Sequence, residues 1–234
     1  MNAIFDELRK IRTPIIYDAI ERFDLRPRNE GYMDRSIKCV LPSLGPMIGY
    51  ACTGKVVAEL PPAQGERLVE MRDVWRYAQR SPGPKVMAVQ DLDQPPRGCA
   101  WGDVAASIFL RLDCVGAITN GGVRDIQEVE KLGFHLFAPG PVVGHAYIRW
   151  VEFDTPVKVG TLNVYPGDLI HADEHGVTVI PKEIPLEKLL DVIKAFLASE
   201  KTLIDYCQQP ELDLDTYVQR VADHEKRIST MANE

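Results

Sequence analysis

The clearest hydrophobic pattern in the chain lies between Gly102 and Asp125. Apolar residues recur there at helical spacing, at Val104, Ala105, Ile108, Phe109 and Leu112. This spacing predicts a helix that begins near Asp103. The apolar run 115–119 then predicts a short buried strand, which the Asn120-Gly121-Gly122 turn ends before a second helical pattern begins. Arg124 and Asp125 are therefore expected where a strand passes into a helix.

Helical and strand patterns alternate along the rest of the chain. Helices are predicted over 13–23, 65–79, 126–132, 184–197 and 212–228, and strands over 47–60, 85–89 and 134–138. Thr13 is expected to cap the first helix ahead of Pro14, and residues 47–60 are expected to form either two strands or one strand with a bulge at Gly54. Residues 146–181 alternate as strands do and predict antiparallel hairpins. The order of elements favours an α/β or α+β domain with a mixed sheet.

Length and charge add limits to this picture. The 234 residues are expected to form one domain over 1–183, followed by a C-terminal helical extension over 184–234. A net charge of -7 argues against broad nucleic-acid binding. No apolar run is long enough to predict a membrane span, and the first residues do not resemble a signal peptide, so we expect a cytoplasmic protein. The five cysteines are expected to be reduced and mostly buried.

The central stretch offers three kinds of chemistry. Gly102 has no side chain that would obstruct the start of the helix. The backbone N–H groups from Asp103 to Ala105 can therefore hold a carboxylate there. Arg124 carries a planar cation, and Asp125 carries a hard oxygen ligand for Mg²⁺ or Mn²⁺. In a second interpretation, Gly102 merely starts one helix and Arg124-Asp125 cap the next. Spacing alone leaves both interpretations open.

The motif GDVAAS over 102–107, followed by GGVRD over 121–125, resembles the signature of the class II pyruvate aldolases. These are the divalent-metal-dependent 4-hydroxy-4-methyl-2-oxoglutarate / 4-carboxy-4-hydroxy-2-oxoadipate aldolases, and their relatives include the regulator of ribonuclease E activity A. The resemblance extends from the 13–23 helix through 158–181. It implies a swivelling β/β/α sandwich with mixed sheets, assembled as a homotrimer or homohexamer.

The same resemblance implies a role for each matching position. Arg124 would bind the pyruvyl group and stabilise the enolate. Gly102, Asp103, Val104 and Ala105 would bind the substrate carboxylate, and Asp125 would hold Mg²⁺ or Mn²⁺, partly through water. Two features depart from the family's pattern: Asn120 stands where Asp is common, and the loop 91–98 is longer.

The implied reaction is cleavage of a carbon–carbon bond in a small 4-hydroxy-2-oxo acid, which yields pyruvate through an enolate. Oxaloacetate decarboxylation passes through the same enolate and needs no base, whereas the base for aldol cleavage is not identified. The alternative is a non-catalytic oligomeric regulator that binds a protein partner such as a ribonuclease. Asp125 favours the enzyme, because a binding protein has no need of a metal ligand beside Arg124.

Four further groups of residues are candidates for chemistry. The acidic stretch 171–176 resembles a metal cluster in composition, but we interpret it as a turn between strands. His135 and His145 stand among apolar residues and are interpreted as packed histidines. Asp18 fits a helix-stabilising or interface role as well as a catalytic one. Glu128 is interpreted as a solvated carboxylate in preference to a ligand of metal-bound water.

Overall fold

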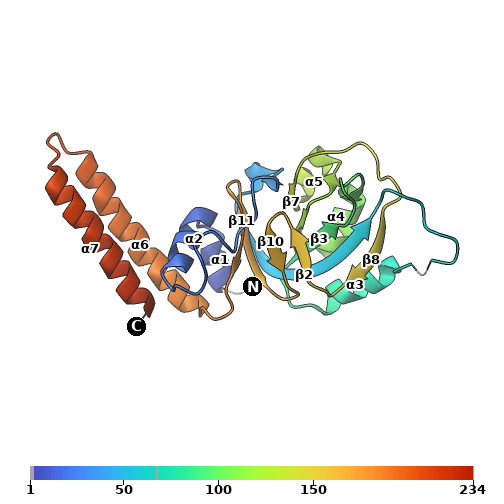
Figure 1. Cartoon of the computed structure of the whole chain (residues 1–234), viewed down its shortest axis with the longest axis horizontal. Coiled ribbons are helices and arrows are strands. Elements are labelled where there is room, and N and C mark those ends of the chain that lie inside the picture. Colours follow the sequence, from blue (N-terminus) through green and yellow to red (C-terminus); the bar gives the residue numbers. More distant parts are fainter. Residues whose placement is uncertain (1–2, 67, 234) are drawn as a thin grey trace. The chain divides into compact units, whose positions relative to one another are not determined.

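The computed structural model describes residues 3–66 and 68–233 (Figure 1). Its internal contacts divide the chain into two compact units. One unit is Asn29–Ile180, and the other joins Met1–Arg28 to Pro181–Glu234. The sequence analysis divided the chain differently, after residue 183, and its division into domains stays a prediction.

The larger unit is built on an eight-stranded mixed sheet in the order β1-β7-β5-β3-β2-β11-β12, with β8 paired to β2. The central strands are parallel: β2 (Met47–Val57), β3 (Lys85–Asp91), β5 (Cys114–Thr119) and β7 (His135–Ala138). The antiparallel strands are β1 (Lys38–Cys39), β8 (Arg149–Phe153), β11 (Leu169–Asp173) and β12 (Gly176–Ile180). Because helices and strands intermix around one mixed sheet, the predicted mixed α/β class is confirmed.

The two faces of the sheet pack into two hydrophobic clusters. Successive residues of β3 alternate between them, with Val86 and Ala88 in one cluster and Met87 and Val89 in the other. This is the two-residue period of a strand that is buried on both faces. It explains why β3 reads as a continuous apolar run in the sequence.

Each cluster joins the sheet to a different layer. One contains side chains from three helices, α3 (Met71–Arg80), α4 (Asp103–Arg111) and α5 (Ile126–Leu132). The other contains side chains from the hairpin of β9 (Val157–Val159) and β10 (Leu162–Val164). Helices therefore cover one face of the sheet and a β-hairpin covers the other, which gives three layers of the β/β/α kind.

A short parallel ladder of β4 (Cys99–Trp101) and β6 (Gly122–Val123) brings together the two halves of the central motif, which are residues 102–107 and 121–125. The backbone N–H of Arg124 donates to the carbonyl of Trp101 across 3.0 Å. The end of β6 is thereby fixed beside the residue that starts α4.

The smaller unit is helical and contains α1 (Ala3–Leu8), α2 (Thr13–Glu21), α6 (Leu186–Cys207) and α7 (Leu214–Asn233). Helices α6 and α7 pack as a hairpin, in which the His224 ring meets Phe196 edge-on at 5.2 Å and its Nδ1 lies 2.8 Å from Ser199 Oγ. Arg22, the C-cap residue of α2, forms an ion pair with Glu225 of α7. Among the described helices, none is both long and apolar enough to cross a membrane.

Several predicted boundaries are wrong. The helix predicted over 65–79 begins only at Met71, because the preceding loop is held by side-chain contacts from β8. Arg12, not Thr13, is the N-cap of α2. Strand β2 runs through Gly54, and its irregular register against β8 lies between Lys55 and Val56.

Candidate functional site

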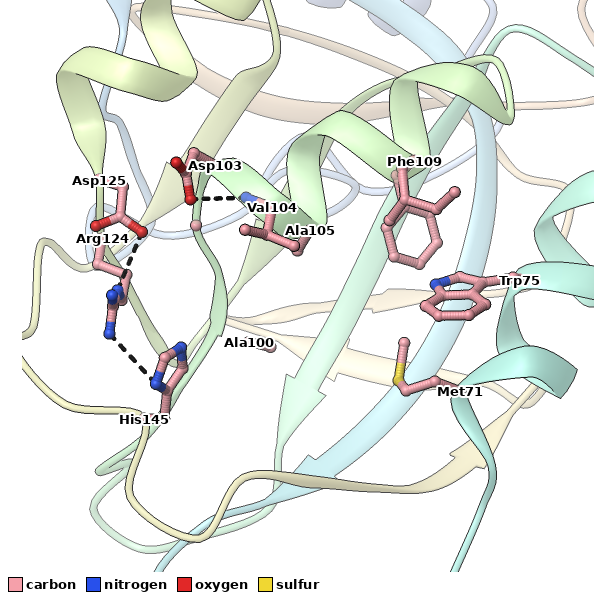
Figure 2. A pocket seen from close by; sticks show the side chains of 12 residues that line it. Met71, Trp75, Ala100, Asp103, Val104, Ala105, Phe109, Arg124, Asp125 and His145 are labelled. Carbon is pink, nitrogen blue, oxygen red and sulfur yellow. Dashed lines mark hydrogen bonds and ion pairs between the residues drawn. The ribbon is translucent and has the colours of Figure 1, made fainter.

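A pocket of about 310 Å³ opens in the larger unit beside the start of α4. Twelve residues line it, from α3, β4, α4, the connection between β6 and α5, and the loop before β8: Met71, Trp75, Ala100, Gly102, Asp103, Val104, Ala105, Ile108, Phe109, Arg124, Asp125 and His145. All the residues predicted to form the site are among them. The pocket thus brings together the two halves of the central motif, as Figure 2 shows.

Gly102 is the N-cap of α4 and has an extended backbone, with φ at -145°. A Cβ at this position would lie 2.4 Å from Asp125 Oδ2 and 3.3 Å from Arg124 Cγ, so a larger residue would displace the Asp125 carboxylate. The first helical hydrogen bond runs from Ala106 N to Gly102 O across 2.9 Å. The N–H groups of the first turn therefore precede the helical ladder, as predicted.

One of those N–H groups already has a partner. The backbone N–H of Val104 donates to Asp103 Oδ1 across 2.7 Å. A carboxylate is thus favoured at this helix end, and here the protein supplies one itself. The Val104 side chain is 79% exposed, so it does not pack into the core as the helical spacing suggested.

Asp125 holds an unusual backbone conformation, with φ 53° and ψ 42° in the left-handed region. Few side chains other than glycine accept this region, and Asp is one of those that do. It stands at the N-cap of α5 but makes no side-chain capping bond. Instead Asp125 Oδ2 accepts from Arg124 Nε across 3.0 Å. The pair with Arg124 therefore orients this carboxylate, and helix capping does not.

Arg124 also contacts His145, across 3.2 Å from its NH1 group to His145 Nδ1. Because a guanidinium can only donate, Nδ1 must be the acceptor, and the neutral ring then carries its hydrogen on Nε2. His145 is exposed in the pocket, so its interpretation as a packed histidine was wrong. No local pattern marks it, since the contact with Arg124 spans 21 positions of sequence.

Cys99 lies directly behind the charged residues and is 1% exposed. Burial raises the pKa of its thiol, and its Sγ donates to the Trp101 carbonyl across 3.0 Å. This cysteine therefore stays neutral and serves the packing of β4.

The donors present fit a divalent cation. Asp125 Oδ2 is engaged by Arg124, whereas Oδ1 makes no hydrogen bond within the described residues. The Asp103 carboxylate lines the same pocket, and Gly102 leaves the space between the two motifs open. Magnesium and manganese are commonly held by one or two carboxylates together with water.

The remaining candidates lie elsewhere. Within the stretch 171–176, Glu174 and His175 form the predicted turn between β11 and β12, and the ligand atoms of Asp173, Glu174 and His175 lie within 4.8 Å of one another. Glu128 is exposed on α5 and does not line the pocket. His135 is half-buried on β7. Asp18 is half-buried in the helical unit, where burial and then Glu21 raise the pKa of its carboxyl.

Comparison with known proteins identifies the family. The model of the RraA-like family, described as Aldolase/RraA, matches residues 13–179. The chain belongs to this family. The matched range contains the whole pocket, so the predicted resemblance is confirmed. The RraA-like family includes aldolases and ribonuclease regulators, and membership alone does not decide between them.

Two curated relatives share part of their length with this RraA-like chain. Protein DlpA of Legionella pneumophila is 30% identical over 131 residues, which is 49% of this chain and 21% of DlpA. A Halalkalibacterium halodurans protein named "Putative 4-hydroxy-4-methyl-2-oxoglutarate aldolase" is 30% identical over 121 residues, 51% of this chain and 55% of that protein. The chain therefore matches about a fifth of the first relative and about half of the second.

Solved structures share the fold. An uncharacterised protein from Pseudomonas syringae pv. tomato has a TM-score of 0.71 at 20% identity, covering 93% of both chains. RraAS2 of Streptomyces coelicolor, described as an unusual member of the RNase ES inhibitor RraA protein family, has a TM-score of 0.65 at 20% identity, covering 89% of this chain and 98% of its own. At these identities the likeness concerns the fold alone.

Proposed function

We propose that this RraA-like protein is a divalent-metal-dependent carbon–carbon lyase that releases pyruvate from a 2-oxo acid. One observation carries the proposal: the Arg124 guanidinium and the open Oδ1 of Asp125 meet in one pocket at the start of α4. A 2-oxo carboxylate can bind to a guanidinium, to a helix N-terminus and to a divalent cation that a protein carboxylate holds. The named aldolase relative supports the same reaction class.

Arg124 would bind the oxygens of the pyruvyl group. Its Nε is held by Asp125 and its NH1 by His145, so the guanidinium is oriented before substrate arrives. A positioned cation stabilises the negative charge that develops on the C2 oxygen when the enolate forms. Nε2 of His145 would donate a further hydrogen bond to a substrate oxygen.

Asp125 would hold Mg²⁺ or Mn²⁺ through its open oxygen, with the Asp103 carboxylate beside it. When bound, the cation supplies Lewis-acid stabilisation of negative charge on the 2-oxo acid. Gly102 serves this arrangement by leaving room for the Asp125 carboxylate.

Two reactions can use this pocket. In oxaloacetate, the C3–C4 bond breaks, CO₂ leaves, and the electron pair forms the enolate, which takes up a proton at C3 to give pyruvate. In a 4-hydroxy-2-oxo acid, the hydroxyl proton must leave as the same bond breaks, and C4 becomes a carbonyl carbon. We assign that proton to Asp103, because Asp125 is committed to the cation and His145 Nε2 already carries a hydrogen.

Pyruvate release from oxaloacetate tests the proposal. We expect purified protein to decarboxylate oxaloacetate with Mn²⁺ or Mg²⁺ and to lose the activity with a chelator. Asp125→Ala and Arg124→Ala should each lower kcat/KM by about 100-fold or more, the usual effect of removing a positioned charge-stabilising group. Glu128→Ala is the matched control, because this carboxylate is exposed one turn farther along α5.

Two results would contradict the enzyme proposal. One is a wild-type protein that releases no more pyruvate than the metal ion does alone. The other is an Asp125→Ala variant that is as active as Glu128→Ala. Either result would favour a regulator that binds a protein partner.

A further inference from the structure

The pocket has two chemically different ends, and the proposed reaction uses only one of them. Figure 2 shows Asp103, Arg124, Asp125 and His145 together on one side. On the other side, the side chains of Met71, Trp75 and Phe109 face the same space. We call these three residues the apolar wall. Ile108, on the helix that also carries Phe109, lines the pocket as well.

Helix α3 presents its part of the apolar wall by its spacing. Met71 and Trp75 are four positions apart and share one helical face. Val74, Tyr77 and Ala78 form the adjoining buried face of the helix, and Met71 and Trp75 lie at the edge of that face. Trp75 remains 36% exposed, so a large apolar ring faces the pocket without being covered by the core. An uncovered tryptophan at the edge of a pocket is typical of a ligand contact.

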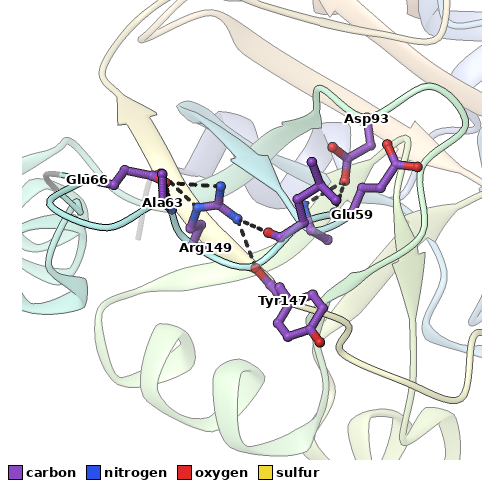
Figure 3. Close-up of polar contacts among 8 residues, drawn as sticks. Glu59, Ala63, Glu66, Asp93, Tyr147 and Arg149 are labelled. Carbon is purple, nitrogen blue, oxygen red and sulfur yellow. Dashed lines mark hydrogen bonds and ion pairs between the residues drawn. The ribbon is translucent and has the colours of Figure 1, made fainter.

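The loop that leads into α3 is held at several points, as Figure 3 shows. Arg149 donates from Nε to Glu66 Oε1 across 2.9 Å and from NH1 to the Leu60 carbonyl across 2.6 Å. Glu66 Oε2 accepts from Ala63 N across 2.8 Å. The start of the loop is fixed as well, because Asp93 Oδ2 accepts from Ala58 N and Glu59 N across 2.6 and 2.7 Å. These contacts fix the loop, and the buried Val74, Tyr77 and Ala78 fix α3 itself against the core. Met71 and Trp75 are therefore held in place before a ligand binds, which lowers the entropic cost of binding.

The basic side chains of the pocket lie at its other end. Among the twelve described lining residues, the basic side chains are Arg124 and His145, which contact each other. With the pyruvyl group bound to Arg124, the C4 substituent of a substrate would extend toward the apolar wall. The indole N–H of Trp75 is a donor there but carries no charge. A second carboxylate would lose water at that end without gaining a cation.

We propose that the substrate is a 4-hydroxy-2-oxo acid whose C4 carries an uncharged apolar group, either alkyl or aryl. This inference rests on the proposed function of the same pocket. The C3–C4 bond breaks, the hydroxyl proton leaves, and C4 becomes the carbonyl carbon of an apolar aldehyde or ketone. The electron pair forms the pyruvate enolate, which is then protonated at C3.

The first test compares two non-reacting 2-oxo acids as inhibitors of oxaloacetate decarboxylation in the presence of Mn²⁺. 2-Oxo-4-phenylbutanoate ends in an apolar ring, whereas 2-oxoglutarate ends in a carboxylate. We expect the apolar acid to have an inhibition constant at least about 10-fold lower, the scale of discrimination that one pocket contact supplies. We also expect 4-hydroxy-2-oxo-4-phenylbutanoate to be cleaved to benzaldehyde and pyruvate.

Variants of α3 locate the preference. Trp75→Ala should lower the ratio of the two inhibition constants about 5-fold or more, and Met71→Lys should shift it toward 2-oxoglutarate by placing a cation at the apolar end. Arg76→Ala is the control, since Arg76 is exposed next to Trp75 and pairs with Asp73. Trp75→Phe should retain most of the ratio. Circular dichroism of each variant shows whether it is folded.

The possible outcomes separate the two proposals. Without any oxaloacetate decarboxylation, the proposed function fails. With decarboxylation but equal inhibition constants, or tighter binding of 2-oxoglutarate, only the apolar-substrate proposal is overturned. A wild-type preference that Trp75→Ala and Met71→Lys leave unchanged would overturn the assignment to the apolar wall.

Discussion

The two ends of the pocket are built in different ways. The charged end comes mainly from one stretch of chain, in which Gly102 and Asp103 start a helix and Arg124 and Asp125 follow the next strand. The apolar wall comes from separate helices, with Met71 and Trp75 on α3 and Phe109 on α4. The charged end can be recognised as a motif. The apolar wall becomes visible only when the helices are packed against the sheet.

Replacement of Asp103 by Asn should divide the charged end into its separate tasks. The amide oxygen of Asn can still accept from Val104 N, which preserves the helix start, but it is a very poor proton acceptor. Cleavage of a 4-hydroxy-2-oxo acid should fall about 100-fold, whereas oxaloacetate decarboxylation should fall less than about 10-fold. Steady-state rates for both substrates measure this difference. Equal losses in the two reactions would argue against Asp103 as the proton acceptor.

Replacement of Gly102 by Ala should disturb the charged end through crowding. The new Cβ would lie 2.4 Å from Asp125 Oδ2, so the carboxylate must move and its pair with Arg124 is strained. We expect about a 10-fold loss of decarboxylation, because a misplaced charged group stabilises the enolate less well. The affinity for Mn²⁺, measured by titration of the protein with the metal, should fall as well. Gly144→Ala adds the same methyl group where there is room for it, since Ala146 N lies 3.8 Å away. If both variants behave alike, space at Gly102 is not what matters.

The apolar wall depends on how firmly α3 is anchored, and Tyr77 allows this to be measured as stability. Burial raises the pKa of Tyr77 to about 12 from its ordinary value near 10. The stabilisation that comes from keeping the Tyr77 hydroxyl neutral is fully present below pH 10. It is lost as pH rises toward 12, because this hydroxyl ionises at a lower pH in the unfolded chain than in the folded protein. Two pKa units correspond to about 2–3 kcal/mol of unfolding free energy.

Tyr77→Phe should therefore flatten the alkaline loss of stability, measured by urea unfolding at pH 8, 10 and 11.5. The variant loses the acceptor of Thr53 N, a contact of 3.3 Å, so it should be about 1 kcal/mol less stable at pH 8. The gap should close or reverse at high pH. Cys114, whose pKa burial also raises to about 12, contributes equally to both proteins. Parallel curves for the two proteins would mean that Tyr77 is not held neutral by burial.

Much of the fold could be predicted because local patterns reflect the finished packing. The apolar runs that became β3 and β5 are buried on both faces of the sheet, and the spacing after Gly102 placed the start of α4 correctly. The helix predicted from residue 65 failed for a non-local reason. The Arg149 side chain holds Glu66 and the Leu60 carbonyl in a loop, and Arg149 is 83 positions away from Glu66 in the sequence.

In the pocket, the sequence by itself determined the parts that depend on neighbouring residues. It marked the helix start at Gly102, and it placed the cation of Arg124 and the carboxylate of Asp125 where a strand passes into a helix. Only the tertiary structure brought His145 to Arg124 and the apolar wall to the same space. The physical reason is range. Turn and helix geometry are set within a few residues, whereas a contact between elements depends on how their buried faces pack.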